Sequence, residues 1–561
     1  MQQSTDDASA TDPVAIRLVR TPCRGLTAEL GSGQRAAVME TLTFGTDGWR
    51  DVIADRFTFA NLRRAAQGYA TYLRSAGGGG DLVLIGYDTR FLAPEFAAAV
   101  AGVLVANGFR ATVSQTYLPT PALSFAVRQR GARGGVMLTA SHNPPRYGGF
   151  KLKGPYGGSA TDDVYRAVAS LVPDADVPEP RGASYDTFDI RDEYYGAVAS
   201  LVDMQAIGRT HPVIVHDAMG GAGSGWLEGL AHVTGAFSVE AVRGRPDPLF
   251  HGVNPEPVPA NLAPTLARMR AVEASGERAG ADTGGLVQGE SRPLFATVTD
   301  GDADRIGVVL PGGDYFNSHQ IFAVLLDHLS ASHSGSVVKT FTVSRVGERL
   351  ARARGLEVIE TPVGFKHIVN AMLAGAGDGA SRGAGVGAGH GAAGSADHGV
   401  GGAGGVLIGG EESGGIGVAG HIPERDAIAN TLLLLEAVVT DGRTLAQRFA
   451  AIEAETGWRH AYDRLDLHPS GDGNKERVMA RLAEGAVSLA LAGWRVASVE
   501  DLDGVKLDLV REDAAHGSEP SAWVLFRASG TEPVLRLYCE APTREDVAAL
   551  LRAAEAFVAG R

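Results

Sequence analysis

The chain has 561 residues, of which 44% are hydrophobic and 21% are charged. This length is too great for one hydrophobic core and predicts about four domains of roughly 150 residues. The formal net charge of −14 argues against a nucleic-acid partner, which requires a basic surface, but is compatible with an anionic small molecule in a locally positive cleft. Cys23 and Cys539 are the only cysteines, so the sequence offers neither a disulfide framework nor a cysteine-rich metal site.

The sequence also lacks the patterns of membrane segments and secretion signals. The longest aliphatic run, 432–439, is interrupted by Glu436 and is shorter than the ~18 apolar residues that a membrane span needs. The chain does not open with a basic stretch followed by an apolar one, as a secretory signal does. We therefore expect a cytoplasmic protein with no membrane partner.

The first part of the chain divides into a polar extension and an alternating block. Residues 1–40 are polar and have no sustained hydrophobic period, which predicts a disordered extension. The block that follows contains a helix from about Thr58, a strand at 82–90, a helix at 94–108, a strand at 110–116 and a helix at 119–129. Strands that alternate with helices at this spacing predict βαβ units in an α/β layer architecture.

The same alternation recurs twice before the pattern changes, which suggests an internal structural repeat. We predict three consecutive mixed α/β domains at 41–185, 190–311 and 312–441. From 444 to 561 a helix is followed by hairpin-forming strands and a terminal helix, which is typical of an α+β domain. Two Gly-rich stretches, 275–291 and 375–405, cannot bury enough apolar surface to offset their ordering entropy, and we expect disordered insertions there.

A serine ends a predicted strand in the first block. The apolar run 134–140 leads into Ser141, and the residues at 143–149 include two prolines and two glycines, which predict a turn. A hydroxyl presented at the end of a rigid strand on an exposed turn is well placed for chemistry. His142 is a poor candidate for its base because neighbouring side chains at a strand end point apart. A capped, solvated loop is the alternative.

Three aspartates alternate in a turn between two apolar strands of the second block. Asp300, Asp302 and Asp304 can point toward one centre, which is the arrangement that a hard divalent cation such as Mg²⁺ prefers. An EF-hand is excluded because Arg305 and Pro311 stand where that motif needs glycine and glutamate. A solvated acidic turn is the other interpretation, but three unpaired carboxylates between buried strands would repel one another.

Two further turns combine polar side chains with glycine. Glu411 and Ser413 follow an apolar strand, and a carboxylate beside a hydroxyl suits hydrogen bonding to sugar hydroxyls. The turn at 527–533 offers an arginine, two hydroxyls and backbone N–H groups, with Arg536 on the strand that follows, and this combination suits a phosphate. A flexible acidic turn and an ordinary hairpin loop are the respective alternatives.

Taken together and in this order, the four motifs resemble those of the α-D-phosphohexomutase superfamily, which includes phosphoglucomutases and phosphomannomutases. The segment TASHNP looks like the family's phosphoserine loop, DGDADR like its magnesium loop, GGEESGG like its sugar-recognition loop and SGTEP like its phosphate-binding loop. The segments FGTDGWR and TPVGFKHI add to the match. The resemblance covers the chain from about residue 42 onward.

The resemblance implies a heart-shaped arrangement of the four domains around a central cleft. It also implies a reversible transfer of a phosphoryl group between C1 and C6 of a hexose phosphate. Ser141 would carry the phosphoryl group, and a hexose 1,6-bisphosphate would be both intermediate and primer. Mg²⁺ would be held by Ser141, Asp300, Asp302 and Asp304.

The resemblance assigns further roles to individual residues. The catalytic candidates are Ser141, Lys151, His142, Arg305, Lys366, His367 and Arg50. The substrate-binding candidates are Glu411, Ser413, Arg527, Ser529, Gly530, Thr531 and Arg536. Lys151, Lys366 and His367 are the alternatives for the general acid or base.

Substrate preference is read from smaller features of the motifs. EESGG and TPVGFK look more like glucose-type members, and Gly415 stands where mannose- and glucosamine-type relatives often carry histidine. Gly148 and Ala528 are departures from residues that are frequent in the family. We therefore expect a phosphoglucomutase, monomeric or dimeric, with a phosphomannomutase or a dual-specificity mutase as the alternative. A phosphoglucosamine mutase and a non-catalytic sugar-phosphate-binding protein are weaker alternatives, since the latter needs no nucleophile and no metal ligands.

Overall fold

The computed structural model describes most of the chain from residue 41 onward. The described ranges are 41–45, 47–77, 80–180, 182–275, 293–381, 405–468, 474–486, 490–515, 517–528 and 534–560. The predicted extension at 1–40, almost all of the predicted insertion at 275–291 and residues 382–404 of the second insertion lie outside these ranges, so those expectations stay predictions. In the described part of the chain, no helix combines the length and the apolar character needed to cross a membrane.

The first sheet carries the serine turn. Its strands are β1 (Trp49–Val52), β2 (Leu82–Tyr87), β3 (Arg110–Ser114), β4 (Gly134–Leu138), β5 (Tyr147–Gly154), β6 (Gly158–Ser159) and β7 (Asp186–Phe188). Within the described residues they follow the order β1-β5-β4-β2-β3-β7, and β6 pairs with β5. The strands β2, β3, β4 and β7 run parallel, whereas β5 is antiparallel to both β4 and β1.

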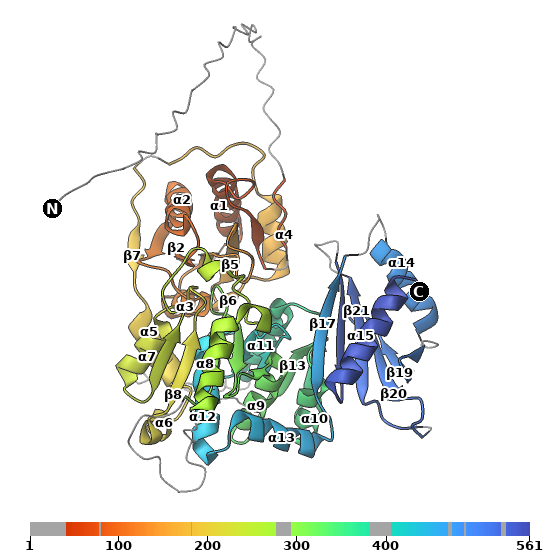
Figure 1. The fold of residues 1–561 in the computed structure, drawn as a ribbon. Coiled ribbons are helices and arrows are strands. Elements are labelled where there is room, and N and C mark those ends of the chain that lie inside the picture. The colour runs from red at the N-terminus through yellow and green to blue at the C-terminus, as the bar shows by residue number, and fades with distance from the viewer. Residues whose placement is uncertain are drawn as a thin grey trace, which may run out of the picture. The chain divides into compact units, whose positions relative to one another are not determined.

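Helices cover both faces of the first sheet. Figure 1 shows α1 (Phe59–Ser75), α2 (Ala93–Ala106) and α4 (Asp162–Ser170) on one side and α3 (Thr120–Gln129) on the other. Thr58 caps α1 by accepting a hydrogen bond from the Asn61 backbone, which confirms the predicted start of this helix. The apolar stripe of α1 packs against α2 and α4, so the alternation read from the sequence produces the predicted α/β layers.

The predicted turn after the serine is shorter than expected. The strand β5 begins at Tyr147, so Gly148 and Gly149 lie in a strand, and the turn ends at Arg146. Side chains do not fit at either glycine: a Cβ on Gly148 would lie 2.4 Å from the ring of Phe57, and one on Gly149 would lie 2.2 Å from the carbonyl oxygen of Thr139. These glycines therefore serve close packing inside a sheet rather than a turn.

The second sheet carries the aspartate turn. Its strands are β8 (Val213–Asp217), β9 (Ser238–Val242), β10 (Ala296–Thr299), β11 (Ile306–Val309) and β12 (Tyr315–Phe316), and their order among the described residues is β12-β11-β10-β8-β9. Its helices are α5 (Arg191–Ala199), α6 (Met204–Thr210), α7 (Trp226–Thr234) and α8 (Ala263–Ala274). Short 3₁₀ turns, η1 (Phe250–Gly252) and η2 (Pro259–Asn261), lie between β9 and α8.

The third sheet carries the Glu411 turn. Its strands are β13 (Ser336–Thr340), β14 (Val358–Thr361), β15 (Val406–Gly410) and β16 (Ile416–Val418), in the order β14-β13-β15-β16 within the described residues. Its helices are α9 (Ser318–Ser330), α10 (Arg345–Ala353), α11 (Phe365–Ser381), α12 (Ala427–Asp441) and α13 (Leu445–Thr456). The helix α11 continues through residues 375–381, where disorder was expected; these residues extend a helix that has already formed from Phe365, and no proline interrupts it.

The three site turns occupy equivalent positions in their sheets. The strands β4, β10 and β15 each run parallel to an inner neighbour and are each followed by an antiparallel strand, β5, β11 and β16. The serine, aspartate and Glu411 turns are the connections within these three strand pairs. The repeat suggested by the sequence is therefore a repeat of structure, with one polar turn at the same edge of each sheet.

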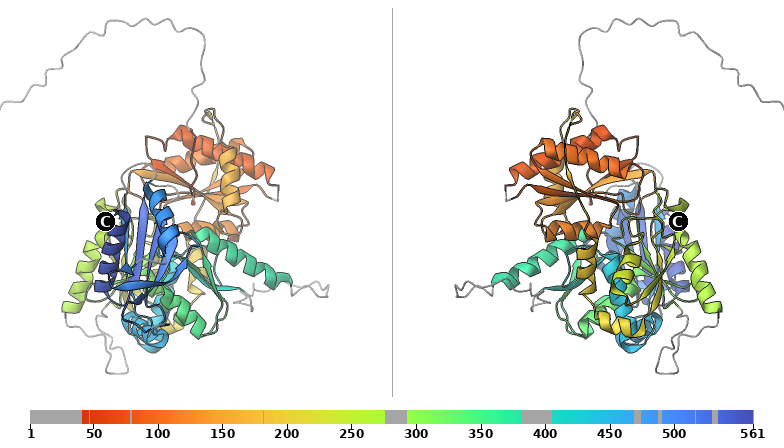
Figure 2. Two further views of the ribbon diagram at one scale, coloured as in Figure 1. Left: turned by 90° about the vertical axis from the view of Figure 1, so that its right-hand side faces the viewer. Right: turned by 90° about the vertical axis from the view of Figure 1, so that its left-hand side faces the viewer.

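The last sheet is antiparallel throughout. Its strands are β17 (Ala461–Leu467), β18 (Ala490–Leu491), β19 (Trp494–Glu500), β20 (Val505–Arg511), β21 (Ala522–Ala528) and β22 (Leu535–Ala541), with helices α14 (Asn474–Gly485) and α15 (Arg544–Val558). In Figure 2 the strands of this sheet and α15, all drawn in blue, lie together, and α15 packs against β22 and β17. The predicted α+β pattern is confirmed.

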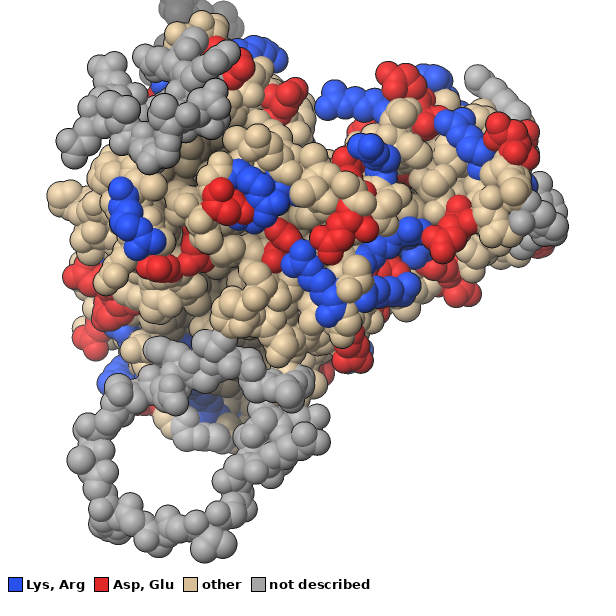
Figure 3. Space-filling model, turned by 90° about the horizontal axis from the view of Figure 1, so that it is seen from below, with Lys and Arg blue, Asp and Glu red and all other residues tan. Residues whose placement is uncertain are grey.

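Alternate residues of the last sheet face two different cores. Val524 and Phe526 belong to the core with α14 and α15, whereas Trp523 and Leu525 belong to the large core shared with the third sheet's helices. The helix α13, which follows the predicted boundary at 444, packs against α9 and α10. On the face seen in Figure 3, basic and acidic side chains are interspersed.

Candidate active site

Ser141 is buried, while the rest of its turn is partly exposed. Ser141 is only 1% exposed and has a left-handed backbone with φ of +50°, a conformation that costs a non-glycine residue free energy. The prediction that the serine is exposed is therefore wrong, because the aspartate turn of the second sheet covers this residue. The hydroxyl of Ser141 donates a hydrogen bond of 2.8 Å to Asp300 Oδ2.

A buried arginine compensates for the strained backbone of this turn. Arg90 follows β2, and its guanidinium donates to the carbonyl oxygens of Ser141 and Asn143 at 2.7 Å each, and to that of Pro144 at 2.8 Å. Asp88 pairs with Arg90 at 3.0 Å. Arg90 also donates to the carbonyl oxygen of Tyr147, so four carbonyl groups point to its guanidinium. These contacts fix the direction of the serine.

The three aspartates converge as the sequence predicted. Each of them is fully buried, and one oxygen from each lies within 4.8 Å of the others. Asp300 Oδ1 accepts hydrogen bonds from the backbone N–H groups of Asp304 and Arg305 at 3.0 and 3.1 Å, which closes the turn. Burial, together with the charges of Asp302 and Asp304, raises the pKa of Asp300 well above its usual value.

This cluster fits a divalent cation. Asp302 Oδ1 and Asp304 Oδ1 are buried and have no hydrogen-bond partner among the described residues. Buried carboxylate oxygens without partners are costly, and oxygen ligands of this kind are those that Mg²⁺ takes. The donor set of the turn therefore suits a hard metal ion beside Ser141.

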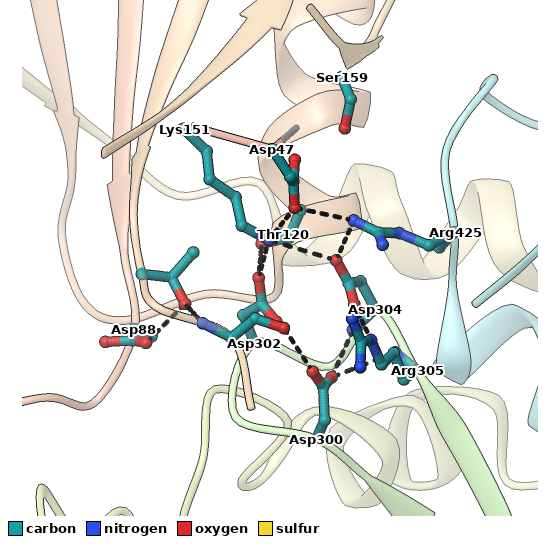
Figure 4. A network of polar contacts seen from close by, with 12 residues as sticks. Asp47, Asp88, Thr120, Lys151, Ser159, Asp300, Asp302, Asp304, Arg305 and Arg425 are labelled. Atoms are coloured by element: carbon teal, nitrogen blue, oxygen red, sulfur yellow. Dashed lines mark hydrogen bonds and ion pairs between the residues drawn. The ribbon is translucent and has the colours of Figure 1, made fainter. Parts of the chain in front are cut away.

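Lys151 lies in the same cluster. Its Nζ lies 3.0 Å from Asp302 Oδ2, 3.5 Å from Asp304 Oδ2 and 3.0 Å from Asp47 Oδ2 (Figure 4). Burial opposes the charged ammonium, but the three carboxylates together raise the pKa of Lys151 above its ordinary value. Lys151 is therefore protonated while no cation shares the aspartates.

Two residues of the cluster were missed by the sequence analysis. Arg425 lies 2.7 Å from Asp304 Oδ2 and 3.3 Å from Asp47 Oδ2 (Figure 4). It also lies 3.4 Å from Glu411 Oε2, and so joins the aspartate turn, the Glu411 turn and the segment before β1. Asp47 forms ion pairs with both Lys151 and Arg425. The segment FGTDGWR, which contains Asp47, could have indicated the first, whereas Arg425 follows a stretch with no local motif.

The Glu411 turn contacts the aspartate turn directly. Arg305 and Gly415 form an isolated β-bridge, and the Ile306 backbone donates to the carbonyl oxygen of Gly414 at 3.0 Å. Burial raises the pKa of Glu411 to about 7, despite the opposing charge of Arg425. Ser413 is half-buried on this turn.

Glu412, between these two residues, has a different role. Thr342 Oγ1 donates to Glu412 Oε2 at 2.5 Å, and Ser318 Oγ donates to the Glu412 carbonyl oxygen at 2.5 Å. Glu412 therefore anchors the turn to β13 and α9, and Glu411 is the carboxylate that lies beside the aspartates.

Arg50 and His142 flank the serine turn. Arg50 donates to Asn143 Oδ1 at 2.8 Å and pairs with Asp47 at 3.3 Å. Burial and the nearby cations Arg305 and Arg50 hold the pKa of His142 well below its ordinary value. His142 is therefore neutral near pH 7 and contributes no positive charge.

Lys366 and His367 lie at the start of α11. Lys366 forms an ion pair of 2.8 Å with Asp162 at the start of α4, so it ties the third sheet's domain to the first. Burial and the charge of Lys366 lower the pKa of His367. Lys151 is thus the one general acid–base candidate whose ion-pair partners are the aspartates beside Ser141.

The predicted phosphate turn is described only in part. Ser529, Gly530 and Thr531 lie outside the described residues. Arg527 Nε donates to Asp503 Oδ2 at 2.9 Å, and Arg536 lies 3.6 Å from Asp466. Asp503 Oδ2 also accepts from the Val363 backbone at 2.8 Å, so one carboxylate connects Arg527 with the segment that carries Lys366.

Comparisons with known proteins identify the family of the chain. Profiles of the phosphoglucomutase/phosphomannomutase family match the chain over four domains, namely α/β/α domain I at 41–177, domain II at 192–313, domain III at 317–456 and the C-terminal domain at 448–556. These profiles cover most of the chain from residue 41 onward.

Curated relatives match nearly the full chain. A phosphoglucomutase/phosphomannomutase of Thermococcus kodakarensis is 27% identical over 506 residues, which is 90% of this chain and 95% of the relative. A probable phosphoglucosamine mutase of Methanothermobacter thermautotrophicus is 28% identical, over 90% and 94% of the two chains. A phosphoglucomutase of Staphylococcus epidermidis is 26% identical, over 90% and 91%.

Solved structures match in the same way. The crystal structure of a putative phosphomannomutase from Thermus thermophilus is 41% identical, covers 93% of this chain and all of its own, and has a TM-score of 0.74. A phosphoglucomutase/phosphomannomutase family protein from Burkholderia thailandensis, 21% identical with a TM-score of 0.69 over 93% and 98% of the two chains, shares the fold. The chain therefore belongs to the phosphoglucomutase/phosphomannomutase family of the α-D-phosphohexomutase superfamily.

Proposed function

We propose that the protein interconverts glucose 1-phosphate and glucose 6-phosphate through a phosphoserine at Ser141 and a glucose 1,6-bisphosphate intermediate. The observation that carries this proposal is the hydrogen bond of 2.8 Å between the Ser141 hydroxyl and Asp300 Oδ2, within a buried cluster of three aspartates. A serine hydrolase would need a base at the serine hydroxyl, and here that hydroxyl meets a carboxylate of a metal-type cluster instead.

The reaction requires two transfers with Ser141 as the carrier. In the first, the bond between phosphorus and Ser141 Oγ breaks as phosphorus bonds the sugar oxygen at C6, whose proton passes to a base. Ser141 Oγ takes up a proton as it leaves. The bisphosphate then reorients in the site, and the bond between phosphorus and the C1 oxygen breaks as Ser141 Oγ loses its proton and bonds that phosphorus. The C1 oxygen takes up a proton. Both ends of the sugar are thus held by one site.

The chain's own residues supply the positions for these steps. Ser141, Asp300, Asp302 and Asp304 would hold Mg²⁺, which when bound neutralises charge on a transferring phosphoryl group. Lys151 is the preferred acid or base because its Nζ lies 3.0 Å from Asp302. With a cation bound at these aspartates, Lys151 would share their charge with it and would give up its proton more readily.

Substrate contacts come from the other turns. Glu411 and Ser413 accept and donate hydrogen bonds to sugar hydroxyls, and Arg527, Ser529, Gly530, Thr531 and Arg536 hold the phosphate that does not react. The choice of glucose rests on the motifs EESGG and TPVGFK. The printed names of relatives include phosphomannomutase and phosphoglucosamine mutase, so mannose and glucosamine phosphates are the competing substrates.

A coupled assay tests the proposal. Glucose 1-phosphate, mannose 1-phosphate and glucosamine 1-phosphate are supplied separately with Mg²⁺ and a hexose 1,6-bisphosphate primer. We expect the largest kcat/KM with glucose 1-phosphate. A larger value with mannose 1-phosphate would establish the phosphomannomutase alternative, and no turnover of any of the three would leave a sugar-phosphate-binding protein.

A further inference from the structure

A loop of the third domain packs closely against the first domain beside the site. Residues 421–426 lie on the β5–β6 hairpin, where the carbonyl oxygen of Pro423 would lie 2.3 Å from a Cβ on Gly158. Arg128 of α3 donates to the carbonyl oxygen of His421 at 3.2 Å. The loop therefore approaches the hairpin as closely as a glycine allows.

A buried ion pair fastens this loop. Lys153 Nζ on β5 donates to Glu424 Oε2 at 2.5 Å, and neither side chain is exposed. Ser124 donates to the same oxygen at 3.0 Å, and Ser159 donates at 3.3 Å. A buried ion pair gains little net stability, because both charges lose their hydration. Its presence between two domains therefore calls for a role other than stability.

Arg425, the residue after Glu424, suggests what the ion pair does. Arg425 contacts Asp304, Asp47 and Glu411 through one guanidinium group, as Figure 4 shows for the first two. Its backbone N–H donates to Glu424 Oε1 at 3.2 Å. On the other side, Asp426 caps α12 by accepting from the backbones of Ile428 and Ala429 at 3.0 Å each.

The first residue of α12, which directly follows this loop, contacts the aspartate turn through its backbone. Ala427 N donates to the carbonyl oxygen of Ala303 at 3.3 Å. Ala303 lies between Asp302 and Asp304 and has φ of +56°. A displacement of the loop would therefore reach the aspartates by two routes, the Arg425 side chain and this backbone contact.

We propose that Lys153 and Glu424 are positioning residues, which hold Arg425 in place so that Asp304 and Glu411 keep their orientations in the site. The inference rests on the proposed function, because it assigns the pair a purpose in that site. Neither residue contacts the reacting atoms, and their effect passes through Arg425.

Three variants separate positioning from plain stability. Glu424→Gln keeps the size and removes the charge that pairs with Lys153. Glu424→Gln alone leaves the Lys153 ammonium buried without its carboxylate partner. The double variant Lys153→Met with Glu424→Gln removes this ammonium as well. Arg448→Met is the matched control, since Arg448 is a buried arginine of α13 that pairs with Asp441 at 2.8 Å and Asp327 at 3.2 Å, and none of these residues belongs to the site.

Each variant is measured by thermal unfolding, by hydrogen–deuterium exchange and by mutase kinetics. The exchange probes are the backbone N–H groups of Asp304 and Arg305, which Asp300 Oδ1 protects. We expect Glu424→Gln to speed exchange at residues 300–305 and to lower kcat about 10- to 100-fold with a smaller change in KM, because small misplacements of catalytic groups have effects of this size. The double variant regains thermal stability but not kcat. Arg448→Met loses stability with kcat and exchange at 300–305 unchanged.

The opposite pattern would overturn the inference. If Glu424→Gln lowers the melting temperature as Arg448→Met does, yet leaves exchange at 300–305 and kcat unchanged, the pair only joins two domains. Recovery of both stability and kcat in the double variant would have the same meaning. Failure of the proposed function would show itself separately, as a wild-type protein without mutase turnover, while the exchange comparison still decides whether the pair orders the aspartate turn.

Discussion

The aspartate turn is strained by its own charge when no cation is present. Asp302 Oδ1 and Asp304 Oδ1 have no hydrogen-bond partner among the described residues, and burial with neighbouring carboxylates raises the pKa of Asp300. Asp302 and Asp304 thus each present one carboxylate oxygen to a ligand, whereas Asp300 Oδ1 also closes the turn. At the scale of single residues, stability and function therefore oppose each other in this turn.

Asp300→Asn tests this opposition. We expect the metal-free variant to be more stable than the metal-free wild type by about 1 kcal/mol, because one buried charge of a repelling cluster is removed. Mg²⁺ should raise the melting temperature of the wild type but not that of the variant. Thermal unfolding with and without Mg²⁺ measures both effects.

Asp314→Asn is the matched control, since Asp314 is exposed in the next turn, between β11 and β12, and should change neither quantity. A metal-free Asp300→Asn protein that is less stable than the wild type, and that Mg²⁺ still stabilises, would contradict this account of the turn.

Single residues also mark the limit of what the sequence predicted. Asp300, Asp302 and Asp304 were recognisable because alternating aspartates in a glycine turn form a local pattern, and the structure brings their oxygens together. Arg425 was not recognisable, because its partners lie in three separate turns. The burial of Ser141 was equally hidden, since a different domain covers it.

At the scale of elements, the site is built by one arrangement used three times. A parallel strand ends, a polar turn follows, and an antiparallel strand returns in β4–β5, β10–β11 and β15–β16. The sequence predicted the strands and helices of each block, because hydrophobic period is a local property. The pairing sense of the strands, and with it the common edge of the three turns, depends on contacts that are distant in sequence.

The Glu411 turn depends on a glycine. A Cβ on Gly415 would lie 2.3 Å from Arg425 Cδ, and four carboxylates hold that guanidinium in place. We expect Gly415→Ala to displace Arg425 and to lower kcat/KM by roughly 10-fold. Steady-state kinetics with glucose 1-phosphate measure the loss.

Gly196→Ala is the comparison variant, since Gly196 lies in α5 and a Cβ there meets no atom within 4 Å. It should leave kcat/KM unchanged. Full activity of Gly415→Ala would mean that the position of Arg425 is not critical, and would also weaken the inference about Lys153 and Glu424.

At the scale of the whole molecule, the last sheet joins the third domain through a buried acid. Glu540 on β22 accepts from Ser344 Oγ at 2.5 Å, from Trp523 Nε1 at 2.6 Å and from the Arg345 backbone at 3.2 Å, and it pairs with His460 at 2.6 Å. Burial alone would raise the pKa of Glu540, but His460 and these hydrogen bonds lower it to about 2.

The lowered pKa of Glu540 predicts how the stability of the protein depends on pH. Because the pKa of Glu540 is lower in the folded protein than in the unfolded chain, its contribution is complete above about pH 4.5 and is lost as the pH falls toward 2. We expect Glu540→Gln to cost on the order of 3 kcal/mol near pH 7. Urea unfolding at a series of pH values measures the difference between the two proteins.

That difference should shrink steadily below pH 4.5. A difference that stays constant from pH 7 to pH 3 would show that Glu540 contributes through packing rather than through its charge.

The central claim concerns Ser141, and label transfer tests it most directly. Glucose 1,6-bisphosphate carrying labelled phosphoryl groups is incubated with the dephosphorylated wild type and with Ser141→Ala, and the modified peptide is identified by tandem mass spectrometry. The account predicts one labelled phosphoryl group on Ser141, its loss when glucose 1-phosphate is added, and no label or turnover in Ser141→Ala. Mutase turnover by Ser141→Ala at the wild-type rate, or turnover by the wild type with no label on Ser141, would contradict it.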